Sequence, residues 1–278
     1  NQTCSLGMPD TVRLFDSMPA IKMDEVTMAA RADFEVMLNG DPQDLRELSE
    51  RVGTTEYFHI WGGVDHWNDC PSDYFSFNSI YFEGEDDENL IWQISYELSS
   101  LFNGASKLFW RDARPITIHK ILLEGKPLDW HEPMMPLSLL RRPAISQYKW
   151  NEEVKCALRM SARLGLMILA TENEDVYMLL KQFELENSWV GYYRLLETID
   201  SHARVKGITI GEDKKERESF TFTANNYSIT GFDSRHGFKD KVKASRLPVM
   251  KIDQGYAFVT KMCKSYLDQA YAQFFKFG

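Results

Sequence analysis

One short segment near the C-terminus carries the residue types that could do chemistry. It runs from Asn225 to a stretch between Gly231 and Gly237 that contains Asp233, Arg235 and His236. A guanidinium binds phosphate or carboxylate groups, and an imidazole titrates near neutral pH. The segment therefore predicts an anion-binding loop with Arg235 as the clamp and His236 as the proton-transfer group. Asp233 would orient one of these side chains, and Asn225 would donate a hydrogen bond.

The same residues also fit a structural turn. In that alternative, Asp233 caps the backbone and Arg235 forms an internal salt bridge. A motif of this length does not separate the two interpretations, because its chemistry depends on the surrounding pocket.

A second group of reactive side chains lies in the loop at residues 61–70 and just before it. His59, His66 and Cys70 could supply three zinc ligands and leave the fourth position open, as in catalytic zinc sites. Cys70 could instead act as a nucleophile with His66 or His59 as its base, although no basic residue nearby favours a thiolate. A packed surface loop rich in Trp and Gly explains the same residues with fewer assumptions.

The remaining motifs give no cofactor. The acidic run at residues 83–88 lacks the spacing of an EF-hand loop and fits a solvated helix N-terminus, where the helix dipole favours negative charge. Motifs for phosphate-binding loops, dinucleotide folds, nucleophile elbows and zinc proteases do not occur in the sequence. We therefore expect no cofactor.

The hydrophobic pattern of the N-terminal half predicts a sheet with two helices. Patterns typical of strands occur at residues 33–40, 57–61, 75–82 and 115–123. One helix is expected at residues 41–53, with Asp41 as its N-cap, and the second after the acidic run. The pair Asn103-Gly104 is expected to end the second helix.

The C-terminal half has helical periodicity. Helices are expected at residues 151–170, 172–184, 188–202 and 252–276, and residues 205–251 show no clear element. The chain is therefore predicted to be an α+β protein, with a mainly antiparallel sheet and two helices in the N-terminal half and a helical half packed on it. Four prolines at residues 127–143 place a boundary between residues 1–136 and 137–278, unless both halves form one continuous domain.

The charge is distributed unevenly along the chain. The 278 residues contain 32 Lys and Arg against 41 Asp and Glu, which gives a net charge of -9 and excludes a uniformly basic surface. Residues 52–106 hold ten acidic and no basic side chains, whereas residues 201–278 hold 14 basic and 8 acidic ones. Six basic residues fall at positions 235–251. A local site for an anionic partner is therefore expected there.

Composition indicates the compartment. The longest apolar run, at residues 164–170, is far shorter than the roughly 20 residues of a membrane-spanning helix, so no membrane association is expected. The sequence shows no secretory signal, and its four cysteines lack the paired spacing of a disulfide framework or a structural zinc site. These features favour a cytoplasmic protein.

Several segments carry a resemblance to other proteins. Residues 189–199, the run Phe222-Thr223-Ala224-Asn225 and the residues Asp233 and Arg235-His236-Gly237 resemble the C-terminal half of a set of uncharacterised bacterial proteins of similar size. The resemblance implies a bacterial, cytoplasmic origin and no particular activity.

Two functions are compatible with these features. The first is a soluble binding or interaction protein whose segment 223–251 binds an anionic ligand or an unknown protein, with nucleic acid as one partner of residues 235–251. The alternative is a hydrolase or transferase that acts on a phosphorylated or nucleic-acid substrate through His236, Arg235 and Asp233.

Overall fold

The structure is a computed structural model that describes residues 34–52, 55–65, 70–134, 145–185, 187–211, 213–238 and 246–275. All of these residues belong to one compact unit, Ala32–Gly278. The predicted boundary between residues 136 and 137 lies within residues 135–144, outside the described residues.

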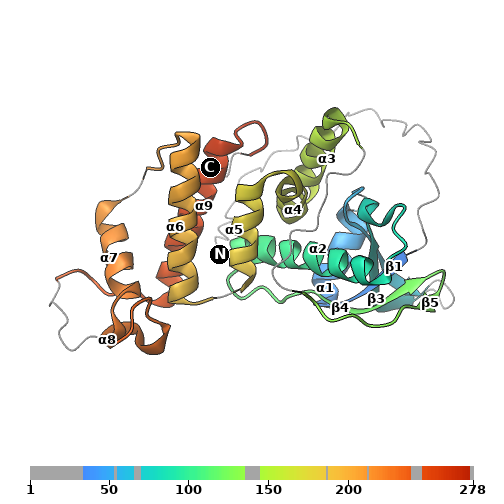
Figure 1. The fold of residues 1–278 in the computed structure, drawn as a ribbon, viewed down its shortest axis with the longest axis horizontal. Helices are drawn as coiled ribbons and strands as arrows, with labels where there is room; N and C mark the ends of the chain where they lie inside the picture. Colours follow the sequence, from blue (N-terminus) through green and yellow to red (C-terminus); the bar gives the residue numbers. More distant parts are fainter. Residues whose placement is uncertain are drawn as a thin grey trace, which may run out of the picture. The chain divides into compact units, whose positions relative to one another are not determined.

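The N-terminal half contains a five-stranded antiparallel sheet, as predicted (Figure 1). Its spatial order is β2-β3-β1-β4-β5. In the central strand, alternate residues Phe34, Val36 and Leu38 are buried, because successive side chains of a strand point to opposite faces. The strands are β1 (Phe34–Asn39), β2 (His59–Asp65), β3 (Cys70–Asn78), β4 (Thr117–Leu123) and β5 (Lys126–Pro127).

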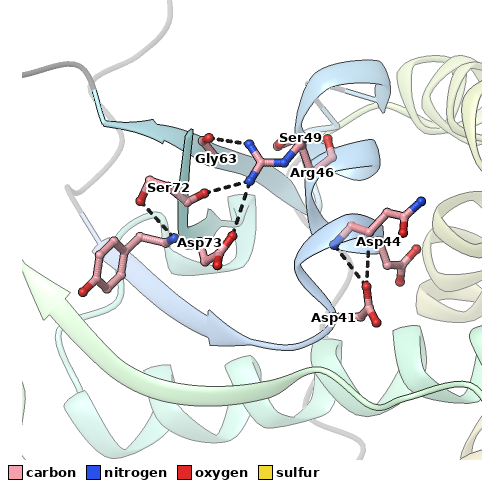
Figure 2. A network of polar contacts seen from close by, with 9 residues as sticks. Asp41, Asp44, Arg46, Ser49, Gly63, Ser72 and Asp73 are labelled. Atoms are coloured by element: carbon pink, nitrogen blue, oxygen red, sulfur yellow. Dashed lines mark hydrogen bonds and ion pairs between the residues drawn. The ribbon is translucent and has the colours of Figure 1, made fainter. Parts of the chain in front are cut away.

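An arginine of the first helix forms hydrogen bonds to the sheet. Helix α1 (Pro42–Glu47) begins after Asp41, whose carboxylate accepts the backbone N–H groups of residues 43 and 44, and a π-helical turn continues it to Val52. The Arg46 guanidinium donates to the carbonyl oxygens of Gly63 (2.6 Å) and Ser72 (3.1 Å), so it joins α1 to the β2–β3 hairpin (Figure 2).

Helix α2 (Glu88–Phe109) is longer than predicted. It begins after Asp87, which caps its first turn, but it continues through the Asn103-Gly104 pair expected to end it. The Asn103 amide is satisfied inside the fold, since it donates to the carbonyl oxygen of Ile116 and accepts from the N–H of the same residue. Tertiary packing therefore overrides the local signal that predicts a turn.

The C-terminal half is helical, as predicted, with corrected boundaries. The expected helix at residues 151–170 is two helices, which meet at the extended residue Ser161. The expected irregular segment at residues 205–251 contains two helices, α7 and α8. The helices are α3 (Gln147–Met160), α4 (Ala162–Glu172), α5 (Glu174–Leu185), α6 (Trp189–Lys206), α7 (Lys214–Ala224), α8 (Tyr227–Thr230) and α9 (Ile252–Ala270).

The two halves share one core. Helix α2 packs against strand β4 of the sheet on one side and against α4 and α5 on the other (Figure 1). Helix α5 in turn packs against α6, and α6 packs against α9. The buried side chains from Phe34 to Phe275 form one hydrophobic cluster. The predicted α+β class is confirmed, with a helical half packed on a sheet.

A buried carboxylate joins three helices of the C-terminal half. Asp175, in the first turn of α5, accepts hydrogen bonds from the hydroxyls of Tyr266 (2.5 Å) and Tyr271 (2.6 Å). The carboxylate also pairs with Lys206 at the end of α6, at 2.8 Å. Burial alone would raise the pKa of Asp175, but the bonds from Lys206, Tyr266 and Tyr271 outweigh it and hold the pKa below its ordinary value of 3.8.

We expect the Asp175→Asn variant to lose about 2 kcal/mol of stability at pH 7, because a charged hydrogen-bond acceptor is removed from three donors. The folded pKa of Asp175 lies below that of the unfolded chain, so this stabilisation is complete above about pH 4 and is lost as the pH falls through the folded pKa. Thermal unfolding at a series of pH values should therefore show wild type and variant converging below about pH 4. A constant difference down to pH 2 would contradict this assignment.

Candidate functional site

The four predicted site residues lie where the end of α7 meets the chain that follows α8. Asn225 is the C-cap of α7, and Asp233 ends a short 3-10 turn, Gly231–Asp233. The backbone N–H of Arg235 donates to the carbonyl oxygen of Ala224 at 2.9 Å, so residues 231–237 fold back onto the end of α7. The structure therefore brings the two parts of the motif together.

Asp233 and Arg235 both contact α6. The carboxylate of Asp233 accepts the backbone N–H of Trp189, the first residue of that helix, at 3.1 Å. The guanidinium of Arg235 donates to Glu197 at 2.8 Å and lies 4.1 Å from the centre of the Tyr193 ring. These are the contacts of the structural alternative, a capping carboxylate and an internal ion pair.

Asn225 and His236 differ from these two residues. The Oδ1 atom of Asn225 is buried and has no hydrogen-bond partner among the described residues. His236 is half-buried beside Arg235. Of the four predicted site residues, which are all described, Asn225 alone has a buried polar side-chain atom without a hydrogen-bond partner.

The structure adds an aromatic cluster that the sequence interpretation missed. The rings of Phe232 and Phe238 each meet the Tyr227 ring edge to face, with centroids 5.8 and 5.9 Å apart. The side chain of Phe232 is 96% exposed and that of Phe238 is 75% exposed. The sequence did contain a signal for this cluster, because two phenylalanines occur in a polar segment that contains two glycines. Phenylalanine is commonly buried, so its presence in such a segment can indicate an exposed binding surface.

The basic residues of this region follow the aromatic cluster. Arg246 and Lys251 are exposed, and Lys251 precedes α9 as its N-cap. The lysines at positions 239, 241 and 243 lie outside the described residues. In sequence, residues 235–251 contain six basic side chains and one acidic one, Asp240. We call residues 223–251 the aromatic-basic segment.

Two of the three predicted zinc ligands, His59 and Cys70, are described, and they lie apart. In the β2–β3 pair, His59 lies opposite Asn78, whereas Cys70 lies opposite Asp65. His59 and Cys70 are therefore at opposite ends of the pair, roughly 20 Å apart for six residues of strand. His66 lies outside the described residues. Among the residues that are described, no cluster of three or more His, Cys, Asp or Glu could hold a metal ion.

The acidic run before α2 has the contacts of a helix N-terminus. Asp87 caps the helix, and the Glu85 carboxylate accepts the backbone N–H groups of Asp86 and Asp87 at 3.2 and 3.1 Å. These bonds, together with the favourable dipole, account for the acidic side chains.

Comparison with protein-family models, curated proteins and solved structures found no match to this chain. The resemblance to uncharacterised bacterial proteins therefore stays a prediction. Within the described part of the chain, no helix combines the length and apolar character needed to cross a membrane.

Proposed function

We propose that the protein is a binding protein whose aromatic-basic segment, residues 223–251, binds single-stranded nucleic acid. The observation that carries the proposal is the exposure of Phe232 and Phe238 in a segment whose sequence has six basic residues at positions 235–251. Exposed rings stack on bases, while Lys and Arg neutralise phosphates, and the combination is typical of surfaces that bind single strands.

The distribution of charge supports an anionic partner at this segment. Arg235 is partly neutralised by Glu197, but positions 239–251 contain five further basic residues and one acidic residue, Asp240. The acidic residues 52–106 belong to the sheet half and α2, so a polyanion would be directed to the C-terminal half. We further propose a bacterial, cytoplasmic protein, because the resemblance implies that origin and the cysteine spacing fits a reducing compartment.

The alternative is a hydrolase or transferase that acts on a phosphorylated or nucleic-acid substrate with His236 as the proton-transfer group. The buried, unsatisfied Oδ1 of Asn225 favours it, because such an atom can await a substrate. The contacts of Asp233 with Trp189 and of Arg235 with Glu197 weigh against it, since both side chains already have structural partners. If the enzyme alternative holds, the His236→Ala variant should bind a labelled oligonucleotide normally but lose its turnover.

The binding proposal is tested with a fluorescein-labelled single-stranded RNA of mixed sequence, titrated at low salt and followed by anisotropy. We expect the double variant Phe232→Ala/Phe238→Ala to bind at least tenfold more weakly than wild type, because one lost base stack costs roughly 1–3 kcal/mol. Both side chains are exposed, so the fold should be unaffected.

Tyr74 provides the matched control, because its side chain on β3 has the same 75% exposure as that of Phe238. The Tyr74→Ala variant should bind like wild type. Wild-type protein that does not bind the RNA would contradict the proposal, as would a double variant that binds it unchanged.

A further inference from the structure

A cavity of about 310 Å³ lies at the C-terminal end of α6. Its described lining residues come from the last two turns of α6, from residues 208–210 that follow, and from α7 and α9, which both pack against α6 (Figure 1). Small-molecule sites have volumes of roughly 300–1,000 Å³, so this cavity has the size for a small ligand.

The turn after α6 closes one side of the cavity. Gly207 has a φ of 67°, a conformation that glycine adopts without strain, and its N–H donates to the carbonyl oxygen of Arg204 at 3.3 Å. The N–H of Ile208 donates to the carbonyl oxygen of Ala203 at 2.8 Å. Residues 208–210 therefore fold back at the helix end, and two of the carbonyl groups that would repel an anion there are already hydrogen-bonded.

One positive charge of the lining is not compensated. Arg217 of α7 is paired with Asp200 of α6, and Asp200 is the one acidic side chain among the described lining residues. Arg204 is exposed, and within the described part of the chain its side chain forms no ion pair or hydrogen bond. The guanidinium of Arg204 is therefore available to a ligand.

The charges around the cavity balance one another. Residues 212–215 contain two acidic and two basic side chains. The next acid, Glu216, is paired with Lys261 at 2.7 Å, and Lys206 is paired with Asp175 at 2.8 Å. Arg204 therefore decides the sign of the charge that the cavity favours.

A hydroxyl and an apolar wall complete the lining. Thr209 is exposed, and its hydroxyl can donate a hydrogen bond. The other lining residues are apolar, with two that are half-buried and two that are buried: Ile208, Ile210, Ala203 and Met262. The cavity thus combines donors for an anion with a surface for an apolar group.

We propose that this cavity binds a small monocarboxylate, with its carboxylate at Arg204 and Thr209 and its apolar body against Ile208 and Ile210. A guanidinium matches both oxygens of a carboxylate. A doubly charged phosphate monoester fits less well, because the cavity offers one unpaired cation and the carboxylate of Asp200 lies in its lining. Among the described residues of the aromatic-basic segment, none lines the cavity, so the proposal does not rest on nucleic-acid binding.

The test is isothermal titration with 4-methylpentanoate and phenylacetate, with their primary amides as neutral analogues of similar size and phenyl phosphate as a dianion. We expect at least one carboxylate to bind roughly tenfold more tightly than its amide, a ratio equivalent to about 1.4 kcal/mol. The Arg204→Gln variant should bind that carboxylate roughly tenfold more weakly and the amide unchanged, because only the charged contact is lost. Thr209→Val should weaken carboxylate binding roughly fivefold.

Arg194→Gln is the matched control, because it removes an exposed arginine of the same helix, ten positions earlier and outside the cavity. It should leave carboxylate binding unchanged. The proposal would be overturned if neither carboxylate bound, or if an amide or phenyl phosphate bound as tightly as the carboxylates. It would also be overturned if Arg204→Gln bound the carboxylate like wild type, or if Arg194→Gln weakened binding as much as Arg204→Gln.

Discussion

Replacing Gly104 with alanine is expected to lower the free energy of unfolding by about 3 kcal/mol, the upper part of the range for overpacking in a core. A Cβ atom at this position would lie 2.0 Å from the carbonyl oxygen of Leu180. That oxygen belongs to the backbone of α5, so α2 and α5 would have to separate. The better helix propensity of alanine, worth about 1 kcal/mol, does not offset this cost. Thermal unfolding should show a midpoint roughly 10 °C lower.

Gly211 provides the control for this substitution. It is exposed, and a Cβ at this position would meet no atom within 4 Å. The Gly211→Ala variant should therefore unfold at the wild-type temperature. If Gly104→Ala also unfolded there, the close approach of α2 and α5 would be wrong.

Replacing Lys181 with methionine is expected to destabilise the protein by about 3 kcal/mol, because it leaves a buried carboxylate without its counter-ion. The Nζ atom of Lys181 on α5 lies 2.9 Å from the carboxylate of Glu97 and 2.7 Å from the hydroxyl of Ser100, both on α2. Tyr177 also donates to Glu97. The side chains of Lys181 and Glu97 are only 9% and 5% exposed, so water does not replace the lost contact.

The second half of this prediction is a double-mutant cycle. Adding Glu97→Gln to Lys181→Met removes the unpaired charge while keeping an acceptor for Tyr177, so the double variant should be more stable than Lys181→Met alone. Chemical denaturation of the four proteins measures the coupling. Additive losses from the two substitutions would mean that the pair does not interact.

The sequence predicted correctly those helices and strands that are specified by residues close together in the chain. The alternation of Phe34, Val36 and Leu38 gave β1, and Asp41 followed by Pro42 marked the start of α1. Helix α2 extends past Asn103 because that side chain bonds to Ile116, a contact that sequence patterns do not contain.

Helix α7 escaped prediction for a different reason. Its buried residues are Ser219, Phe220, Thr223 and Ala224, and only two of these four are apolar, so the hydrophobic period is faint. Its first turn and a half carries five consecutive charged residues, 214–218, which resemble an irregular polar segment. The helix is fixed by packing against α6 and α9 rather than by its own pattern.

The sequence indicated which residue types the candidate site contains, but it did not identify the residues of α6 that they contact. Partners of Asp233 and Arg235 are residues Trp189 and Glu197 of α6, which lie 44 and 38 positions earlier in the chain. The exposure of Phe232 likewise depends on where the segment between α8 and α9 lies. Side-chain chemistry can be read from sequence, whereas partners and exposure require the fold.

The most direct test of the central proposal is the salt dependence of binding to single-stranded RNA. If phosphates meet the basic residues at positions 239–251, the logarithm of the association constant should fall linearly with the logarithm of salt concentration. The Lys241→Gln/Lys243→Gln variant should reduce the magnitude of that slope by about 1.4, since each phosphate contact on a single strand contributes about 0.7. Binding that is independent of salt, or a slope that is identical in wild type and variant, would contradict nucleic-acid binding through the aromatic-basic segment.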